Sequence, residues 1–189
     1  MRNVWVLVGA SAGIYGALAF VMGVLPGIVL SHVPATPGLR PLTAEQAAGR
    51  EVYVSEGCAY CHSQVVRPLA QDKAFGRPSV AGDYVYATPE LLSDHRNGPD
   101  LTNVGTRQPS DVWNAIHLYE PRALVAGSIM PAYPYLFIVR TKALANETVV
   151  PVPAPWGPPG EVVVMGPQAK ALIAYIESLK QVPLGARSP

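Results

Sequence analysis

The sequence Gly57-Cys58-Ala59-Tyr60-Cys61-His62 contains both cysteines of this 189-residue chain, with a histidine directly after the second. The spacing C-x-x-C-H is the attachment signature of c-type haem, in which two thiols form thioethers with the haem vinyl groups. The adjacent imidazole is then well placed to ligate the iron. The motif therefore predicts one covalent haem c, bound through Cys58 and Cys61, with His62 as an axial ligand.

Three other uses of a cysteine pair compete with haem attachment. A zinc site needs four ligands, and the chain has no second cysteine pair to complete one. A thioredoxin-like redox pair requires a βαβ context, of which the sequence shows no sign. A disulfide across two intervening residues would close a very short loop and stabilise the fold little. Haem attachment is the interpretation that we favour.

The second axial position decides between electron transfer and catalysis, because a sulfur ligand closes the iron to small molecules. The chain has four methionines, and two of them belong to its apolar N-terminus. Met130, which precedes the rigid segment Pro131-Ala132-Tyr133-Pro134, is favoured over Met165, which follows three valines and is also a candidate core residue. A histidine ligand stays open as an alternative, and the candidates are His32, His95 and His117.

The composition excludes several classes of protein. Hydrophobic residues make up 49% of the chain and charged residues only 14%, about half of the charge of an ordinary soluble domain. The net charge of +1 gives no basic face for nucleic acid. The apolar content argues against a disordered chain, and two cysteines are too few for a disulfide-rich secreted domain. The 17 glycines and 20 prolines favour loops and turns over a large sheet.

Residues 1–31 are predicted to form a single transmembrane anchor. Val4–Leu30 contains no charged residue, and as a helix it would be about 40 Å long, enough to cross a hydrocarbon core of about 30 Å. Arg2 precedes this run, and the next positive residue is Arg40, so the positive-inside rule places the N-terminus in the cytoplasm. A cleaved signal peptide and a buried soluble helix are the alternatives. The run is longer than the apolar region of a signal peptide, which favours the anchor.

After the anchor we expect a Pro-rich, extended linker over 32–42, a haem-binding domain over 43–182 and a tail over 183–189. Thr43 and Gln46 form a capping-box pattern, which predicts a helix from about Ala44 to Glu56. Gly57 is then a plausible helix stop just ahead of Cys58.

The remainder of the domain is predicted to be mainly loop and helix. Residues 63–109 show little periodicity, and Ser110 is expected to cap a helix through Leu118. The apolar residues of that helix expected to face inward are Val112, Trp113 and Ile116. A last amphipathic helix is predicted from Pro167 to about Lys180. Between these helices, the β-branched runs 148–152 and 161–165 predict a Pro-rich β-hairpin insertion over about 146–166.

Several blocks of the sequence together resemble one family. The blocks are Gly57 to Pro68, Ser79 to Tyr86, Gly98 to Leu101, His117 to Arg122 and Met130 to Pro134. In this order, and after a single anchor, they are similar to the CcoO/FixO family, the membrane-anchored mono-haem subunit of cbb3-type haem-copper oxidases. The resemblance covers about residues 43–136.

The resemblance implies a mainly α, class I cytochrome c-like domain on the periplasmic face of the inner membrane. It implies His62 and Met130 as the axial ligands of the haem iron. Around them it places the Pro99 carbonyl against His62, Arg67 near a haem propionate, and Tyr133 beside the ligand set.

The function implied by the resemblance is electron transfer within a respiratory terminal oxidase. The expected partner is a polytopic catalytic subunit containing haem b and copper, with another cytochrome c subunit or a soluble cytochrome as the electron donor. The alternatives are the equivalent subunit of a nitric oxide reductase and a free-standing haem protein, either a membrane-tethered shuttle or a gas sensor. The sequence contains no motif for independent catalysis, so we expect a non-catalytic redox subunit.

Overall fold

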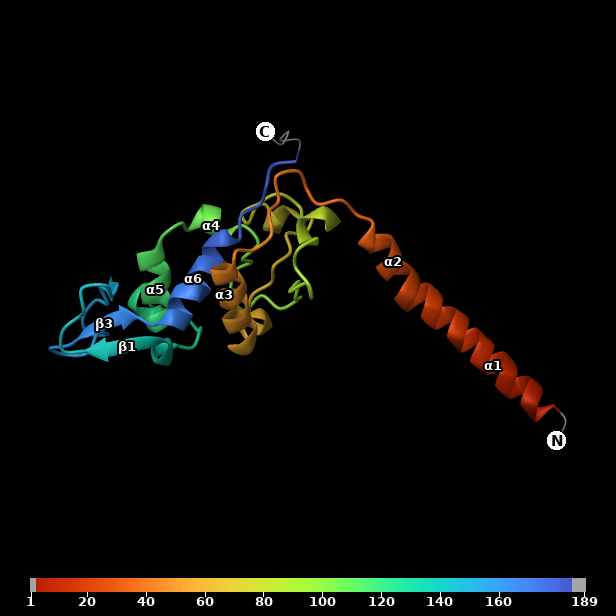
Figure 1. Ribbon diagram of the computed structural model, residues 1–189, viewed down its shortest axis with the longest axis horizontal. Helices are drawn as coiled ribbons and strands as arrows, with labels where there is room; N and C mark the ends of the chain where they lie inside the picture. Colours follow the sequence, from red (N-terminus) through yellow and green to blue (C-terminus); the bar gives the residue numbers. More distant parts are fainter. Residues whose placement is uncertain (1–2, 185–189) are drawn as a thin grey trace.

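The computed structural model describes residues 3–184 of the chain. Figure 1 shows one long N-terminal helix that projects away from a domain of helices and loops, with a small sheet at the end of the domain farthest from that helix. Arg2, on which the predicted orientation depends, lies outside the described residues, as do residues 185–189 of the predicted tail.

The anchor is one continuous helix from Val4 to Ser31, long and apolar enough to cross a membrane. It consists of α1 (Val4–Ala19), a π-helical turn (Phe20–Val24) and α2 (Leu25–Ser31). Pro26 accounts for the π-helical turn, because its ring lacks an N–H and clashes with the carbonyl four residues earlier. All residues of the helix are exposed. The core helix of a soluble domain would be mostly buried, so this exposure fits a membrane anchor.

The linker was expected to be stiff and extended, and the structure shows in addition that it is held on the domain at Thr36. Thr36 is buried, its N–H donates to the Gly82 carbonyl at 3.0 Å, and its hydroxyl donates to Asp83 at 2.8 Å. Gly82 itself has no room for a side chain, since a Cβ would lie 2.8 Å from the Pro34 carbonyl oxygen. Tertiary hydrogen bonds thus fix a segment that composition alone predicts to be a spacer.

Helix α3 (Ala44–Ser55) begins with the predicted capping box. The Thr43 hydroxyl accepts a hydrogen bond from the Gln46 N–H at 3.3 Å, and the Thr43 N–H donates to the Gln46 side chain at 2.9 Å. Gly57 follows the helix with φ +73°, a left-handed conformation that disfavours a side chain, and so redirects the chain into the cysteine motif.

Helix α3 packs tightly against α6 (Pro167–Ser178). At Gly49 a Cβ would lie 1.8 Å from the Ala171 carbonyl oxygen, so only glycine allows the two backbones to approach this closely. Tyr53 and Tyr175 pack edge to face, with ring centroids 5.4 Å apart. This crossing holds the start and the end of the domain together.

Helix α5 (Asp111–Tyr119) is capped as predicted, since the Ser110 hydroxyl accepts from the Trp113 N–H at 3.2 Å. Ile116 is buried and Trp113 half-buried, but the prediction that Val112 faces inward is wrong: it is 48% exposed. Its neighbour Ala115 is fully buried instead. The buried face of the helix therefore includes Ile116 as predicted, but Ala115 in place of Val112.

The core lies between α3, α5, α6 and the sheet. Its buried members include Val52, Tyr53, Ala115, Ile116, Leu118, Leu136, Phe137, Val163, Ala169, Leu172, Ile173 and Tyr175.

The insertion is a three-stranded antiparallel sheet rather than a two-stranded hairpin. Its strands are β1 (Phe137–Arg140), β2 (Val149–Val150) and β3 (Val162–Met165), in the order β1-β3-β2. The predicted pairing of β2 with β3 is confirmed, with Val149 opposite Val164. Strand β1 is additional, and it pairs with β3 from Phe137 opposite Met165 onward.

Residues 63–109 are mostly loop, as predicted. They contain two 3₁₀ turns (Ala70–Asp72 and Ala81–Tyr84) and the short helix α4 (Val104–Arg107). Further 3₁₀ turns occur at Cys58–Tyr60, Pro121–Ala123 and Pro134–Leu136.

Candidate functional site

The cysteine motif forms one tight turn directly after α3. The Cys58 carbonyl accepts hydrogen bonds from the Cys61 N–H at 3.2 Å and from the His62 N–H at 3.0 Å. Both cysteines are free thiols and half-buried. Burial raises the pKa of the Cys58 thiol to about 12, so this thiol is protonated at neutral pH. The turn therefore presents two thiols and an imidazole from five consecutive residues.

The ring of His62 is fixed by a second loop. Its Nδ1 lies 2.8 Å from the Pro99 carbonyl oxygen, which can only accept, so Nδ1 carries the proton and Nε2 has the free lone pair. This is the contact expected between Pro99 and His62. Gly98 lets the loop pass over the ring, because a Cβ there would lie 2.2 Å from Cε1 of His62. Burial also lowers the pKa of His62, which favours the neutral form that binds metals.

His62 and Met130 line the same cavity of about 220 Å³. The residues around this cavity are His62, Pro99, Leu101, Val104, Arg107, Gln108, Trp113, Asn114, His117, Leu118, Met130 and Ile176. Met165 lies elsewhere, at the end of β3 beside a larger groove between the linker, α5, β2 and α6. The fold thus brings one of the two candidate methionines to the predicted proximal histidine.

The loop that carries Met130 is tied down on both sides of the methionine. Arg122 donates to the Met130 carbonyl at 3.2 Å, and the Met130 N–H donates to the Ser128 hydroxyl at 3.2 Å. Tyr133 is buried, and its N–H donates to the Leu118 carbonyl at 2.9 Å. Burial raises the pKa of Tyr133 to about 12, so its hydroxyl is neutral. Tyr133 therefore anchors this loop to α5.

His117, one of the histidines left open as an axial ligand, is also a residue of this cavity. It stacks on Trp113, with ring centroids 4.6 Å apart, and its Nδ1 is buried without a hydrogen-bond partner among the described residues. The other histidines lie away from the cavity: His32 contacts the Ile28 carbonyl on the anchor, and His95 is exposed. The stacking itself was not predicted, although Trp113 and His117 are one helical turn apart, a spacing that places two side chains side by side.

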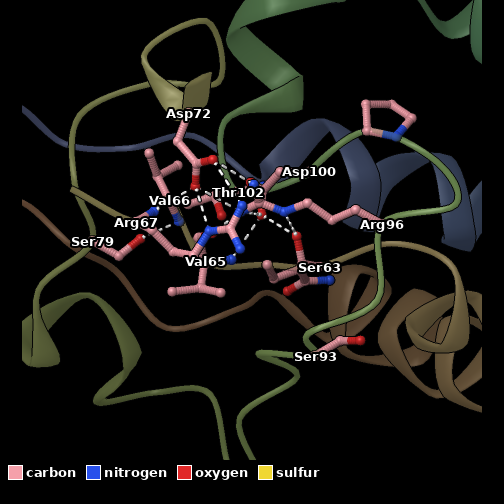
Figure 2. A network of polar contacts seen from close by, with 12 residues as sticks. Ser63, Val65, Val66, Arg67, Asp72, Ser79, Ser93, Arg96, Asp100 and Thr102 are labelled. Carbon is pink, nitrogen blue, oxygen red and sulfur yellow. Dashed lines mark hydrogen bonds and ion pairs between the residues drawn. The ribbon is translucent and has the colours of Figure 1, made fainter. Parts of the chain in front are cut away.

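A buried polar network joins the loop after the cysteine motif to the loop of Pro99. We call Ser63, Asp72, Arg96 and Asp100 the Asp100 network. Figure 2 shows the Arg96 guanidinium between the two carboxylates. Both carboxylates and Ser63 are fully buried. Hydrogen bonds from Arg67 and Arg96 hold the pKa of Asp72 well below its usual range.

Arg67, expected near a haem propionate, forms an ion pair with Asp72 of this network. Its guanidinium contacts both oxygens of Asp72 at 3.0 Å, and its side chain is 44% exposed. The site thus contains two arginines that neutralise two buried acids, and Arg67 is one of them.

The residues present fit a haem. The imidazole of His62, with its free Nε2, and the thioether of Met130 line one cavity, whose other walls include Leu101, Val104, Leu118 and Ile176. The two thiols belong to the turn that ends at His62. Such a setting suits a flat, largely apolar macrocycle with a central metal. Nδ1 of His117, which has no hydrogen-bond partner within residues 3–184, is a further polar atom that a bound group would satisfy.

Comparison with known proteins gives one family. The family model described as cytochrome c oxidase, mono-haem subunit/FixO, matches residues 3–154, from the start of the anchor into the segment after β2. A search of curated proteins gives no match.

Proposed function

This chain belongs to the FixO family of mono-haem subunits of cytochrome c oxidase, and from that premise we propose that it relays electrons through one covalent haem c to a catalytic subunit. The family implies one haem and assembly with other oxidase subunits. The observation that carries the finer proposal is that His62 and Met130 line one cavity, with His62 oriented by Pro99.

In this proposal each donor has a separate task. Cys58 and Cys61 would hold the haem through thioether bonds, and Nε2 of His62 and the sulfur of Met130 would ligate its iron. The haem iron supplies a one-electron couple between its ferric and ferrous states. The chain's own residues orient the imidazole, keep it neutral and exclude water from the cavity walls.

Two axial protein ligands favour electron transfer over catalysis. His62 and Met130 together would leave the iron no free position for oxygen or nitric oxide, so the site would serve one-electron transfer alone. Chemistry on the terminal acceptor then belongs to the partner, which we infer to be a polytopic subunit with haem b and copper. The donor is another cytochrome c subunit or a soluble cytochrome. The family match favours this oxidase role over a nitric oxide reductase subunit or an independent shuttle.

We infer that the helix Val4–Ser31 spans the inner membrane with the N-terminus in the cytoplasm. The domain then lies on the periplasmic face, where cytochromes c receive their electrons. The exposed apolar surface of the helix supports this placement, and so does the absence of a positive residue between Val4 and Leu39.

The test is purification of the full chain from membranes in mild detergent. We expect a polytopic subunit with haem b and copper to copurify, and the complex, but not this chain alone, to oxidise reduced donor with oxygen. Non-haem iron in place of copper would transfer the chain to a nitric oxide reductase. Recovery of a lone haem protein that still exchanges electrons with a soluble pool would make it a tethered shuttle.

A further inference from the structure

We propose that the Asp100 network is a positioning device for the contact between His62 and Pro99, and that Ser63 and Asp100 thereby help to set the reduction potential of the bound haem. This inference rests on the proposed function. It adds residues that contact neither thiols nor the cavity, and it assigns them an effect that can be measured at the iron.

The first support is the position of the two residues in the chain. Ser63 directly follows His62, and Asp100 directly follows Pro99. The Ser63 hydroxyl donates to Asp100 Oδ2 at 2.6 Å, so a short side-chain bond lies one residue beyond each partner of the Nδ1–carbonyl contact. These two loops are separated by more than 30 residues of irregular chain, so they need such cross-links to keep their register.

Backbone hydrogen bonds extend the same alignment on both sides of His62. The Gly98 N–H donates to the Cys61 carbonyl at 3.0 Å, and the Leu101 N–H donates to the Ser63 carbonyl at 2.9 Å. The Pro99 carbonyl is therefore located between two backbone bonds and beside one side-chain bond. A shift of the loop 98–101 relative to 61–63 would have to break all three.

Asp100 fixes both loops from the inside. Its Oδ2 also accepts from the Val65 N–H at 2.9 Å, and its Oδ1 accepts from the Thr102 N–H at 2.9 Å. Arg96 completes the link, donating to Ser63 Oγ and to the Val65 carbonyl, each at 2.6 Å. Figure 2 shows the Arg96 guanidinium and the Asp100 carboxylate at the centre of these contacts.

The burial of the network gives it one favoured arrangement. Ser63, Asp72 and Asp100 are fully buried, and Arg67 and Arg96 balance the two negative charges. A buried polar group left without its partner is costly, so the loops cannot slide without losing several such bonds together. The network therefore restrains the carbonyl more tightly than a solvated loop would.

The effect on the iron follows from the chemistry of the imidazole. A hydrogen bond from Nδ1 to a carbonyl raises the basicity of the ring, which favours the ferric state and lowers the reduction potential. A looser Pro99 carbonyl weakens that bond. Variants that release the loop should therefore raise the potential while leaving both axial ligands in place.

The experiment compares Ser63→Ala and Asp100→Asn with wild type in the full haem-loaded chain. Ser63→Ala removes one buried hydroxyl and is the milder change, so it keeps the test available if Asp100→Asn does not fold. The readouts are the reduction potential and the rate at which the His62 Nδ1 proton exchanges with solvent in the ferrous protein. We expect a higher potential and faster exchange in both variants.

Asp83→Asn is the matched control. Asp83 forms a comparable ion pair with Arg77, at 2.6 Å, but its partners are Thr36, Arg77 and Val80, away from the His62 loop. This variant should lose stability and keep the wild-type potential. An unchanged or lower potential in Ser63→Ala would overturn the inference. Wild-type protein without covalent haem, measured as pyridine haemochrome, would instead overturn the proposed function and the inference with it.

Discussion

At the scale of single residues, the two methionines of the domain make different predictions. Met130→Leu should remove the weak sulfur-to-iron charge-transfer band of the oxidised protein and lower the reduction potential, because a thioether ligand stabilises the ferrous state. Met165→Leu should change neither, since Met165 lies beside another groove. Absorption spectroscopy and redox titration of both variants provide the measurement. The reverse pattern would assign the ligand to Met165, and a band missing from wild type would favour a histidine such as His117.

The second prediction at this scale concerns the covalent attachment of haem to the two cysteines. Replacing Cys58 and Cys61 together by serine should leave no haem on the polypeptide after denaturation, because serine cannot form the thioether bonds. Wild-type chain should retain one haem under the same conditions and give a c-type pyridine haemochrome. Extraction of the haem from wild type by acid acetone would contradict covalent attachment.

The lowered pKa of Asp72 predicts how the stability of the folded chain depends on pH. Its folded pKa lies below the ordinary value, so its contribution is fully present above the unfolded pKa of about 3.9 and is lost as the pH falls toward the folded pKa. Asp72→Asn should therefore be less stable than wild type at neutral pH, with a smaller loss of stability between about pH 4 and pH 2. Denaturant unfolding at a series of pH values checks this, with exposed Asp94→Asn as the control. Parallel pH profiles for wild type and Asp72→Asn would contradict it.

At the scale of elements, Gly49 tests the crossing of α3 and α6. Alanine normally stabilises a helix by about 1 kcal/mol relative to glycine, but overpacking a tight contact costs about 1–3 kcal/mol. Because the added Cβ would meet a backbone carbonyl, we expect the clash to dominate and Gly49→Ala to be destabilised. Urea unfolding of wild type and Gly49→Ala measures the free energy of unfolding of each. Gly127→Ala, where the added Cβ has no neighbour within 4 Å, should remain close to wild type.

Local elements were predictable from the sequence because their signals are local. The capping pattern of Thr43 and Gln46, the Ser110 cap and the cysteine motif each lie within a few residues, and each has its expected structure or spacing. Strand β1 was not predicted, because it pairs directly with β3, a strand that follows it in the sequence only after β2. Val112 was misplaced because helical spacing gives a periodicity but not the direction in which the core lies.

The candidate site divides in the same way. The sequence predicted the contact of His62 with Pro99 and favoured Met130 over Met165, and the folded chain places Met130, but not Met165, on the cavity of His62. The Asp100 network could not be predicted, since its members come from loops without periodicity and pair across tens of residues. A lone charged residue in such a loop normally indicates solvent exposure.

At the scale of the whole molecule, the docked linker makes a prediction of its own. Thr36→Val keeps the shape of the side chain and removes its hydrogen bond to Asp83. The segment around Thr36 should therefore lose protection against backbone hydrogen exchange. We expect faster backbone hydrogen exchange over residues 34–39 and a stability loss of about 1 kcal/mol. Hydrogen-exchange mass spectrometry of the full chain measures the exchange of residues 34–39 in Thr36→Val and in the control variant, and denaturant unfolding measures the stability. Exposed Thr141→Val should match wild type, and unchanged exchange in Thr36→Val would show that the linker is held by other contacts.

This docking also changes how much space the domain can search above the membrane. A spacer over 32–42 could extend about 38 Å, whereas the segment left free between Ser31 and Thr36 reaches about 14 Å. The volume that the domain can occupy scales with the cube of the tether length, so it falls about twentyfold. The local concentration of the domain near a neighbouring subunit rises by the same factor. Repeated electron delivery to one fixed acceptor gains from such confinement, whereas a carrier that must visit distant partners would lose by it.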